Sequence, residues 1–270
     1  MYSFDKKVTN PKPGLIPPAA DRKPQFPVMP LLFGAASADT GRPIIPRAAV
    51  KPIVGLYGND KLSNCSSVAI ANGINGISAL LYPSAPQSRQ IITTANVNYF
   101  YSRSTGYDPS KPGTDRGADA DTVARMVQMT GYPTHSEFLF PAIGEVEFSN
   151  IPSLRHGLDA FGVLNLGVGL SINDIKNDVW VTGTTPDDRM GSYGYHMLNL
   201  WDYEGVGLDD PVTLLSFGRP QQSTWRWVLE RTVVCYGHAY HQLLTPCGQS
   251  FDHQGWTEYL QNCRACSTSY

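Results

Sequence analysis

The sequence predicts an α+β domain, with an extended proline-rich arm before it and a cysteine-rich tail after it. Residues 65–81 repeat apolar side chains at helical spacing, whereas residues 194–203 form a mostly apolar run of strand length that begins at a glycine-rich turn. The chain of 270 residues is long enough to bury a core as one globular unit. We expect an arm over residues 1–52, a folded domain over residues 53–234 and a tail over residues 235–270.

The arm is set apart by its proline content. Ten of the 21 prolines lie within residues 1–52. Proline has a fixed φ and no backbone N–H, so the arm is expected to be extended rather than helical or part of a central strand. An unattached leader is one interpretation. The other is an ordered arm that packs on its own domain or on a neighbouring subunit, which suits a protein that ties itself into an assembly.

The predicted helix begins at a cysteine, Cys65. Its apolar positions recur at intervals of three or four residues, at Ile70, Ile74, Ile77 and Leu81. Ser63 and Asn64 are suitable capping residues just before it. A thiol in the first turn lies near the positive end of the helix dipole, which favours the thiolate. A buried structural cysteine is the alternative interpretation.

A histidine and an asparagine extend this motif. His196 lies near the start of the predicted strand, 131 residues after Cys65. Thiol-based acyl transfer requires such a cysteine together with a histidine from a distant part of the chain. Asn59 lies six residues before Cys65. Its side-chain amide is suited to join the Cys65 backbone N–H in holding an oxyanion. We therefore predict that Cys65, His196 and Asn59 form a catalytic site; an ordinary packed histidine is the alternative for His196.

These motifs, in this order, resemble the papain-like cysteine peptidases. In that family a glutamine lies six residues before the nucleophilic cysteine, the histidine opens a strand of the second lobe, and an Asn-Ser-Trp-Gly stretch follows. Here Asn59, Cys65 and His196 match the first three features, and residues 215–218 (Leu-Ser-Phe-Gly) match the fourth. The chain is similar in particular to a divergent branch common in bacteriophage genomes. The resemblance implies a two-lobed fold, with a helical lobe led by the Cys65 helix and an antiparallel β lobe carrying His196.

The sequence departs from the family pattern at two positions. Ser66 follows the cysteine in place of tryptophan, and Leu215 takes the place of the asparagine that orients the histidine. A leucine side chain cannot hydrogen-bond an imidazole, and in triad hydrolases the third residue fixes the tautomer of the base. Ser216 and Asp202 are the candidates for this orienting role, with a backbone carbonyl as a further option.

Two functional classes follow from the resemblance. In the first, the protein is a thiol hydrolase in which Cys65 attacks the carbonyl of a peptide or peptide cross-link, His196 shuttles the proton and Asn59 helps to hold the oxyanion. In the second, the fold is a scaffold with weak or no activity. The protein is then a decoration, neck or tail component of a phage particle, and its partners are neighbouring virion subunits or further copies of itself. No cofactor is expected, and the expected location is the host cytoplasm during synthesis and, for the second class, the virion.

The region between the two motifs has ordinary features. Residues 96–101 are aromatic and resemble a turn-rich segment, and the acidic residues of 115–121 (Asp-Arg-Gly-Ala-Asp-Ala-Asp) precede a helical pattern at 122–129. Alternating aspartates can bind calcium, but the glycine and glutamate of an EF-hand loop do not follow at the required offsets. We interpret the aspartates as acidic capping of a helix and predict no metal site here. Residues 152–160 are expected to form a short helix and residues 161–170 a buried strand.

The tail contains four of the five cysteines, Cys235, Cys247, Cys263 and Cys266. Three interpretations compete. Zinc binding would use the Cys-x-x-Cys pair at 263–266 with Cys235 or a histidine. Disulfides, within or between chains, would leave Cys65 as the odd thiol, and this interpretation is favoured because it explains the odd total. Reduced, inert thiols are the third interpretation.

The composition narrows the classes of partner. A net charge of −2 gives no electrostatic reason for binding to nucleic acid or to an anionic membrane. No apolar run approaches the length of a membrane span, and the first residues lack the hydrophobic stretch of a signal peptide. Peptides and proteins remain as the expected ligands.

Overall fold

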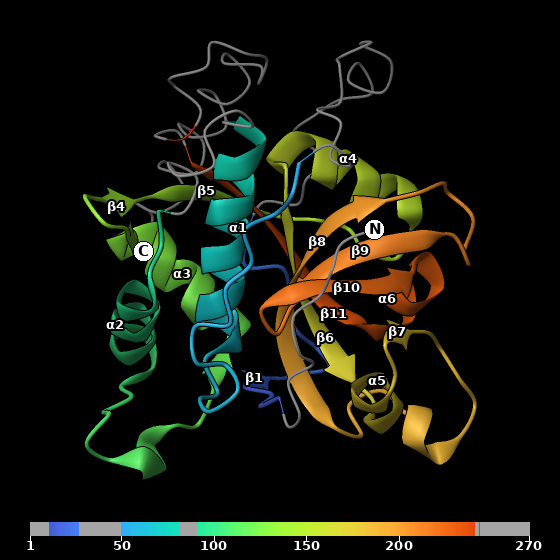
Figure 1. Ribbon diagram of the computed structural model, residues 1–270, viewed down its shortest axis with the longest axis horizontal. Helices are drawn as coiled ribbons and strands as arrows, with labels where there is room; N and C mark the ends of the chain where they lie inside the picture. Colours follow the sequence, from blue (N-terminus) through green and yellow to red (C-terminus); the bar gives the residue numbers. More distant parts are fainter. Residues whose placement is uncertain (1–10, 27–49, 82–90, 241–242, 244–270) are drawn as a thin grey trace.

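The computed structural model describes residues 11–26, 50–81, 91–240 and 243 (Figure 1). Its helices are α1 (Cys65–Leu81), α2 (Thr94–Thr105), α3 (Ala120–Thr130), α4 (Ile151–Phe161), α5 (Ile172–Lys176) and α6 (Trp225–Arg231), with two 3-10 turns, η5 (Pro112–Thr114) and η6 (Pro186–Asp188). None of the helices in these described ranges is long and apolar enough to cross a bilayer.

The largest sheet within the described ranges has seven strands, six of them joined by antiparallel pairing. Its order is β5 (Pro141–Glu145), β11 (Thr232–Tyr240), β6 (Leu164–Leu170), β8 (Gly194–Tyr203), β9 (Pro211–Ser216), β10 (Arg219–Thr224) and β7 (Val179–Trp180). Only the β10–β7 pair of this sheet is parallel. Two small sheets flank it, a parallel pair of β1 (Leu15–Ile16) with β2 (Ala118–Asp119) and an antiparallel pair of β3 (Tyr132–Pro133) with β4 (Phe138–Leu139).

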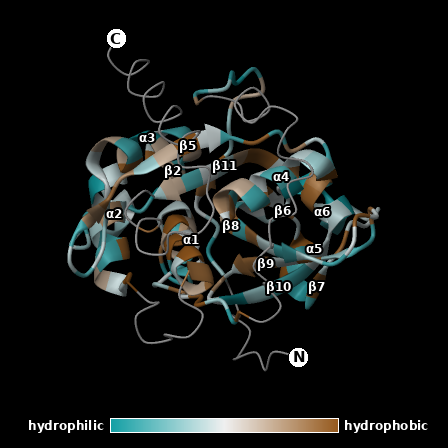
Figure 2. Ribbon diagram, turned by 90° about the horizontal axis from the view of Figure 1, so that it is seen from above, coloured by the Kyte–Doolittle hydropathy of each residue, from teal (hydrophilic) through white to brown (hydrophobic). Residues whose placement is uncertain are grey.

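Helix α1 is the central element of the fold. It stands between α2 and α3 on one side and the large sheet on the other, and it is largely hydrophobic in the view from above (Figures 1 and 2). Every residue from Cys65 to Leu80 is buried, as expected for a helix packed on all sides. A Cβ atom at Gly76 would lie 2.9 Å from Cζ3 of Trp201, so glycine at this position lets α1 approach β8 closely. Asn199 of β8 then donates from Nδ2 to the Ala69 carbonyl at 3.0 Å.

The two faces of the large sheet bury different sets of side chains. Met197 and Trp201 of β8 belong to the core that surrounds α1, whereas Leu198 and Leu200 pack into a second core with α4 and α6. This alternation is the usual consequence of the two-residue repeat of a strand. Strand β8 therefore separates the two cores, and its first residues lie where α1 begins to cross it.

The structure confirms the predicted helix over residues 65–81 and the predicted strand over residues 194–203, both with the same bounds. The helix expected over 152–160 is α4, and the strand expected over 161–170 is β6, which begins three residues later. The expectation of a turn-rich segment at 96–101 was wrong, because these residues lie within helix α2.

The described parts of the arm and the tail are integrated with the domain. Leu15 and Phe26 are buried in the core around α1. Strand β11 continues past residue 234 to Tyr240 and pairs with both β5 and β6. The sheet thus extends six residues beyond the boundary expected between domain and tail.

Candidate active site

Cys65 is the first residue of α1 and has no exposed surface. The loop before it contains a tight turn in which Tyr57 and Gly58 have positive φ angles of 48° and 80°. Asn64 does not cap the helix as expected. Its Nδ2 instead donates to the Tyr57 carbonyl at 3.0 Å, and its Oδ1 has no hydrogen-bond partner among the described residues. The side chain of Asn64 therefore fastens the turn to the start of α1.

Asn59, the candidate oxyanion donor, follows this turn and is fully buried. Its backbone N–H donates to the Leu56 carbonyl at 2.9 Å. The side-chain Nδ2 donates to two carbonyl oxygens, that of Leu62 at 3.1 Å and that of Lys12 at 3.3 Å. The donor predicted to hold an oxyanion is thus already in contact with a peptide carbonyl, which belongs to the arm.

His196, the candidate base, lies at the start of β8 and is 1 % exposed. Its Nε2 lies 3.1 Å from Oγ of Ser216. The ring of Phe217 stacks on the imidazole with centroids 4.1 Å apart and an angle of 21° between the planes. Nδ1 has no hydrogen-bond partner among the described residues. One ring nitrogen is therefore held, while the other is left for a further interaction.

The turn between β9 and β10 brings Ser216 and Phe217 to the imidazole. Ser216 pairs with Arg219, and the two residues between them, Phe217 and Gly218, have φ angles of 47° and 76°. Positive φ at both central residues characterises a type I′ hairpin turn. For Phe217 this conformation costs roughly 1–2 kcal/mol, which the surrounding contacts must offset.

The structure distinguishes between the two candidates for the orienting role. Ser216 contacts the imidazole, whereas Asp202 lies six residues farther along β8, about 20 Å away for an extended strand. Leu215, the residue at the position of the family's asparagine, is buried. A serine hydroxyl at the next position thus contacts the ring where the family pattern has an amide.

Burial keeps both reactive groups uncharged in this structure. It raises the pKa of the Cys65 thiol to about 11, against hydrogen bonds from the backbone of Met197 and Gly14 that act in the opposite direction. It lowers the pKa of His196 to about 3. Met197 follows His196 on β8, so the thiol lies beside the start of this strand. No hydrogen bond joins the thiol to the imidazole, because Nδ1 is unpartnered within the described residues and Nε2 contacts Ser216.

The arm lies against the residues of the candidate site. Its residues 11–16, called the arm segment below, run between the loop that precedes α1 and the start of β8. On the first side, the N–H of Lys12 donates to the Asn59 carbonyl at 3.3 Å. On the second, the N–H of Gly14 donates to the Tyr195 carbonyl at 3.2 Å, and the hydroxyl of Tyr193 donates to the Pro11 carbonyl at 2.5 Å.

The arm segment passes through a slot that admits only glycine at its narrowest point. A Cβ atom on Gly14 would lie 2.2 Å from the Ser63 carbonyl oxygen. On the opposite wall, Gly117 has a φ of 78°, and a Cβ atom there would lie 2.2 Å from the Gly14 carbonyl oxygen. The Gly14 carbonyl oxygen accepts a hydrogen bond from the Ala118 N–H at 2.8 Å, next to the pairing of β1 with β2.

Three ion pairs from two basic residues hold the arm, and two of them use aspartates that were expected to cap a helix. Lys12 Nζ lies 2.5 Å from Oδ2 of Asp115. Arg22 contacts Asp121 at 2.5 Å and Glu145 at 2.8 Å. Among the acidic residues of 115–121, Asp119 caps α3 by accepting from the Thr122 N–H, whereas Asp115 and Asp121 bind the arm. The expectation of acidic residues at a helix start is therefore correct for Asp119, the cap of α3, and for Asp121 in its first turn, which also binds the arm, whereas Asp115 lies outside the helix.

Of the four cysteines of the tail, the structure describes only Cys235. Cys235 lies in β11 as a free, buried thiol whose pKa is raised by burial. No group of three or more potential metal-binding side chains occurs within the described ranges. Cys247, Cys263 and Cys266 lie outside the described residues.

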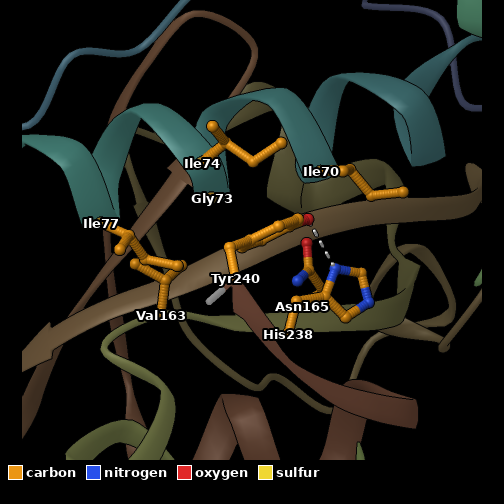
Figure 3. A pocket seen from close by; sticks show the side chains of 8 residues that line it. All are labelled: Ile70, Gly73, Ile74, Ile77, Val163, Asn165, His238 and Tyr240. Carbon is orange, nitrogen blue, oxygen red and sulfur yellow. Dashed lines mark hydrogen bonds between the residues drawn. The ribbon is translucent and has the colours of Figure 1, made fainter. Parts of the chain in front are cut away.

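A buried polar cluster between α1 and the sheet was not anticipated from the sequence. Figure 3 shows Asn165, His238 and Tyr240 close together beneath the isoleucines of α1, and the space among them is too small for a water molecule. His238 Nδ1 lies 3.4 Å from the Tyr240 hydroxyl, and its Nε2 is unpartnered within the described residues. Burial lowers the pKa of His238 to about 3. This cluster lies within the core and is not a substrate pocket.

A second hollow adjoins the arm segment. It has room for about one water molecule and is lined by Pro11 together with Phe217 and by residues of β7, β10 and α5, namely Trp180, Arg219, Gln221, Asp174 and Ile175. The ring of Phe217 lines this hollow and also stacks on His196.

Comparison with known proteins places the fold. No protein-family model and no curated protein matches the chain. Xylellain, a cysteine protease from Xylella fastidiosa, is similar with a TM-score of 0.50 and 14 % identity, over 87 % of this chain and 98 % of that one. A procathepsin L 3 from the Tenebrio molitor larval midgut has a TM-score of 0.48 and 13 % identity over 86 % of this chain and 76 % of that one. A structure from work on the mite allergens Blo t 1 and Der p 1 has a TM-score of 0.46 and 15 % identity over 70 % of this chain and 67 % of that one. The likeness to xylellain shows that the chain has the mixed α+β fold of papain-like cysteine proteases.

Proposed function

We propose that the protein is a thiol hydrolase that acts on a peptide or peptide cross-link, and that the arm segment holds it in a closed resting state. Cys65 is the nucleophile, His196 the base, Asn59 the oxyanion donor and Ser216 the residue that positions the imidazole. The observation that carries this proposal is the state of His196. A buried histidine with Nε2 held by Ser216 and Nδ1 unpartnered, on the strand beside the thiol, is arranged for proton transfer.

The reaction follows once the arm segment leaves. Water then reaches both groups, and their pKa values return toward the ordinary values of about 8.5 for the thiol and 6.5 for the imidazole. Cys65 Sγ transfers its proton to His196 and attacks the carbonyl carbon. The C–N bond of the tetrahedral intermediate breaks as His196 gives this proton to the leaving amine. Water then hydrolyses the thioester, which releases the acid and restores the thiol.

Asn59 has two roles in this scheme, one in each state. In the closed state its Nδ2 donates to the Lys12 carbonyl. In the open state the same N–H is available to the carbonyl oxygen of a substrate, together with the Cys65 backbone N–H at the start of α1. The arm segment therefore occupies the donor that a substrate needs.

We expect a thiol-reactive, peptide-like probe to modify Cys65 of the full-length chain at neutral pH, and His196→Ala to slow this reaction by about tenfold or more. Without the imidazole, only the few per cent of thiolate that an ordinary cysteine has near pH 7 can react. Mass spectrometry of the digested protein assigns the modified cysteine. Cys235→Ser is the matched control, because it removes the other described thiol and is expected to leave the labelling of Cys65 unchanged. Equal labelling of Cys65 in the presence and absence of His196 contradicts the proposal.

We expect Ser216→Ala to slow this labelling about tenfold, which is the effect of losing one hydrogen bond that orients a reacting group. The control is Ser223→Ala on β10. Ser223 is also buried, but it donates to the Trp180 carbonyl and has no contact with His196. If the two variants react at the same rate, Ser216 has no positioning role.

A scaffold without activity is the second candidate, and the filled site favours it. In this alternative the arm segment is a permanent part of the fold, and the protein serves as a structural subunit, such as one of a phage particle. The two candidates differ in what happens when the arm segment is displaced: the hydrolase gains a reactive Cys65, whereas the scaffold gains none.

A further inference from the structure

We infer that Asp115 is a specificity residue that selects a lysine or arginine side chain in the substrate. This inference rests on the proposed hydrolase function and names the substrate class of the same site. It comes from the way in which the arm segment, through Lys12, already occupies both Asn59 and Asp115.

Asp115 is fixed in the wall of the site. Its side chain is 5 % exposed. It accepts from the Ser63 backbone N–H at 3.0 and 3.2 Å and from the Tyr101 hydroxyl at 2.6 Å. Ser63 is two residues from Cys65, so these bonds tie the carboxylate to the segment that carries the nucleophile. The carboxylate is thus an immobile negative group beside the loop that leads into Cys65.

Lys12 shows how a basic residue fits this wall. Its carbonyl accepts from Asn59 Nδ2 at 3.3 Å and its backbone N–H donates to the Asn59 carbonyl at 3.3 Å. Its ammonium group reaches Oδ2 of Asp115 at 2.5 Å. One residue therefore spans from the oxyanion donor to the carboxylate. A substrate residue whose carbonyl lies at Asn59 has its side chain within reach of Asp115, provided that the side chain is as long as lysine or arginine.

The two ion pairs of Arg22 show that the arm has an anchor besides Lys12. Arg22 fastens the arm through Asp121 and Glu145, and none of its hydrogen bonds reaches Asn59 or the loop before Cys65. Only the Lys12 pair lies at the site itself. When the arm segment leaves, Asp115 retains Tyr101 and Ser63 as donors but loses its cation.

A partly buried carboxylate without a counter-charge is unfavourable, and a cationic side chain removes this cost, whereas an uncharged chain of equal length does not. Burial acts to raise the pKa of the Asp115 carboxyl, but with Lys12 in place the hydrogen bonds from Lys12, Tyr101 and Ser63 hold it below its usual range. After the arm segment leaves, the Ser63 N–H and the Tyr101 hydroxyl remain as donors, and they favour the ionised carboxylate. A charge-assisted hydrogen bond of this kind corresponds to a preference of about tenfold or more.

The test uses the full-length chain with Lys12→Met and Gly14→Ala, which removes the internal cation and obstructs the seating of the arm segment. Two thiol-reactive peptide probes are compared that differ only in the residue that bears the reactive carbonyl, lysine in one and norleucine in the other. We expect Cys65 to react about tenfold or more faster with the lysine probe. Asp115→Asn in the same chain is expected to bring the ratio of the two rates close to one.

The controls separate this inference from the proposed function. Asp119→Asn alters a carboxylate four residues away that caps α3 and forms no ion pair with the arm, although the Asp119 backbone pairs with Ile16, so the ratio is expected to persist. Equal rates with both probes overturn the role of Asp115 and leave the hydrolase intact, whereas no reaction with either probe overturns both. If Asp115→Asn melts early, the ratio is measured at low and high salt instead. A charge-based preference declines with salt, and a salt-independent ratio counts against Asp115.

Discussion

Replacing Gly14 with alanine is expected to raise the rate at which Cys65 reacts with a thiol reagent by about 10- to 100-fold. The added methyl group has no room, since it would lie 2.2 Å from the carbonyl oxygen and 2.4 Å from the carbonyl carbon of Ser63. Both are backbone atoms that cannot rotate away. The arm segment must therefore shift out of the slot, and the thiol that it covers becomes accessible.

The size of this effect follows from the cost of overpacking. Forcing an extra methyl group into a packed site costs roughly 1–3 kcal/mol, and each 1.4 kcal/mol changes a population about tenfold. The closed state loses this free energy, whereas the open state, in which Gly14 is exposed, does not. The open population rises accordingly, and the reaction of a buried thiol follows that population when opening is fast.

Gly113→Ala is the matched control for this prediction. Gly113 lies in the turn η5, and a Cβ atom there has no neighbour within 4 Å. The same substitution is therefore made at a position with free space. The labelling rate of Cys65 in this variant is expected to equal that of the natural chain. A correctly folded Gly14→Ala protein that reacts no faster than the natural chain would show that the protection of the thiol does not depend on the arm segment.

The elements that were predictable from the sequence are those specified by local patterns. The isoleucines of α1 repeat at helical spacing, and β8 is a continuous apolar run bounded by a glycine turn. Helix α2 was missed because its aromatic residues and asparagines suggested turns. A signal was nevertheless present, since Thr93 and Asn96 form a reciprocal capping box at its start.

The position at which the arm binds could not be predicted from the sequence, because it depends on contacts between distant residues. Lys12 and its partner Asp115 are 103 residues apart, and Arg22 and Glu145 are 123 apart. Nothing in the local pattern of 115–121 distinguishes an aspartate that caps a helix from one that binds an arm. The proline content predicted that the arm is extended, but not the slot between Ser63 and Gly117 through which it passes.

The candidate site was predictable in its residue types more than in its geometry. The position of Cys65 at a helix start followed from the periodicity of α1. The contact between Ser216 and His196 required the turn at Phe217 and Gly218, whose positive φ angles decide which side chain of the hairpin meets the ring. Phenylalanine at the first turn position is unfavourable locally, so propensity alone would not place it there.

Acidification is expected to destabilise the protein through its two buried histidines, His196 and His238. Burial lowers the pKa of each to about 3 in the folded chain, against 6.5 for an ordinary histidine. The unfolded chain therefore binds protons that the folded chain rejects. The stability contributed by the neutral rings is complete above pH 6.5 and is lost progressively as the pH falls toward 3. Each ring contributes a slope of about 1.4 kcal/mol per pH unit in this window.

His238→Gln isolates one of these two contributions without touching the candidate active site. Glutamine does not titrate, so the unfolding free energy of this variant is expected to fall less steeply with acid, by about 1.4 kcal/mol per pH unit. Urea denaturation at a series of pH values below 6.5 measures the difference. Carboxylates such as Asp115 and Asp121, which also lose stabilising interactions in acid, are common to both chains and cancel. His156→Gln, an exposed position on α4, is expected to keep the full slope. If His238→Gln and the natural chain instead show parallel curves, His238 is protonated in the folded state, and the core around α1 then accommodates a charge.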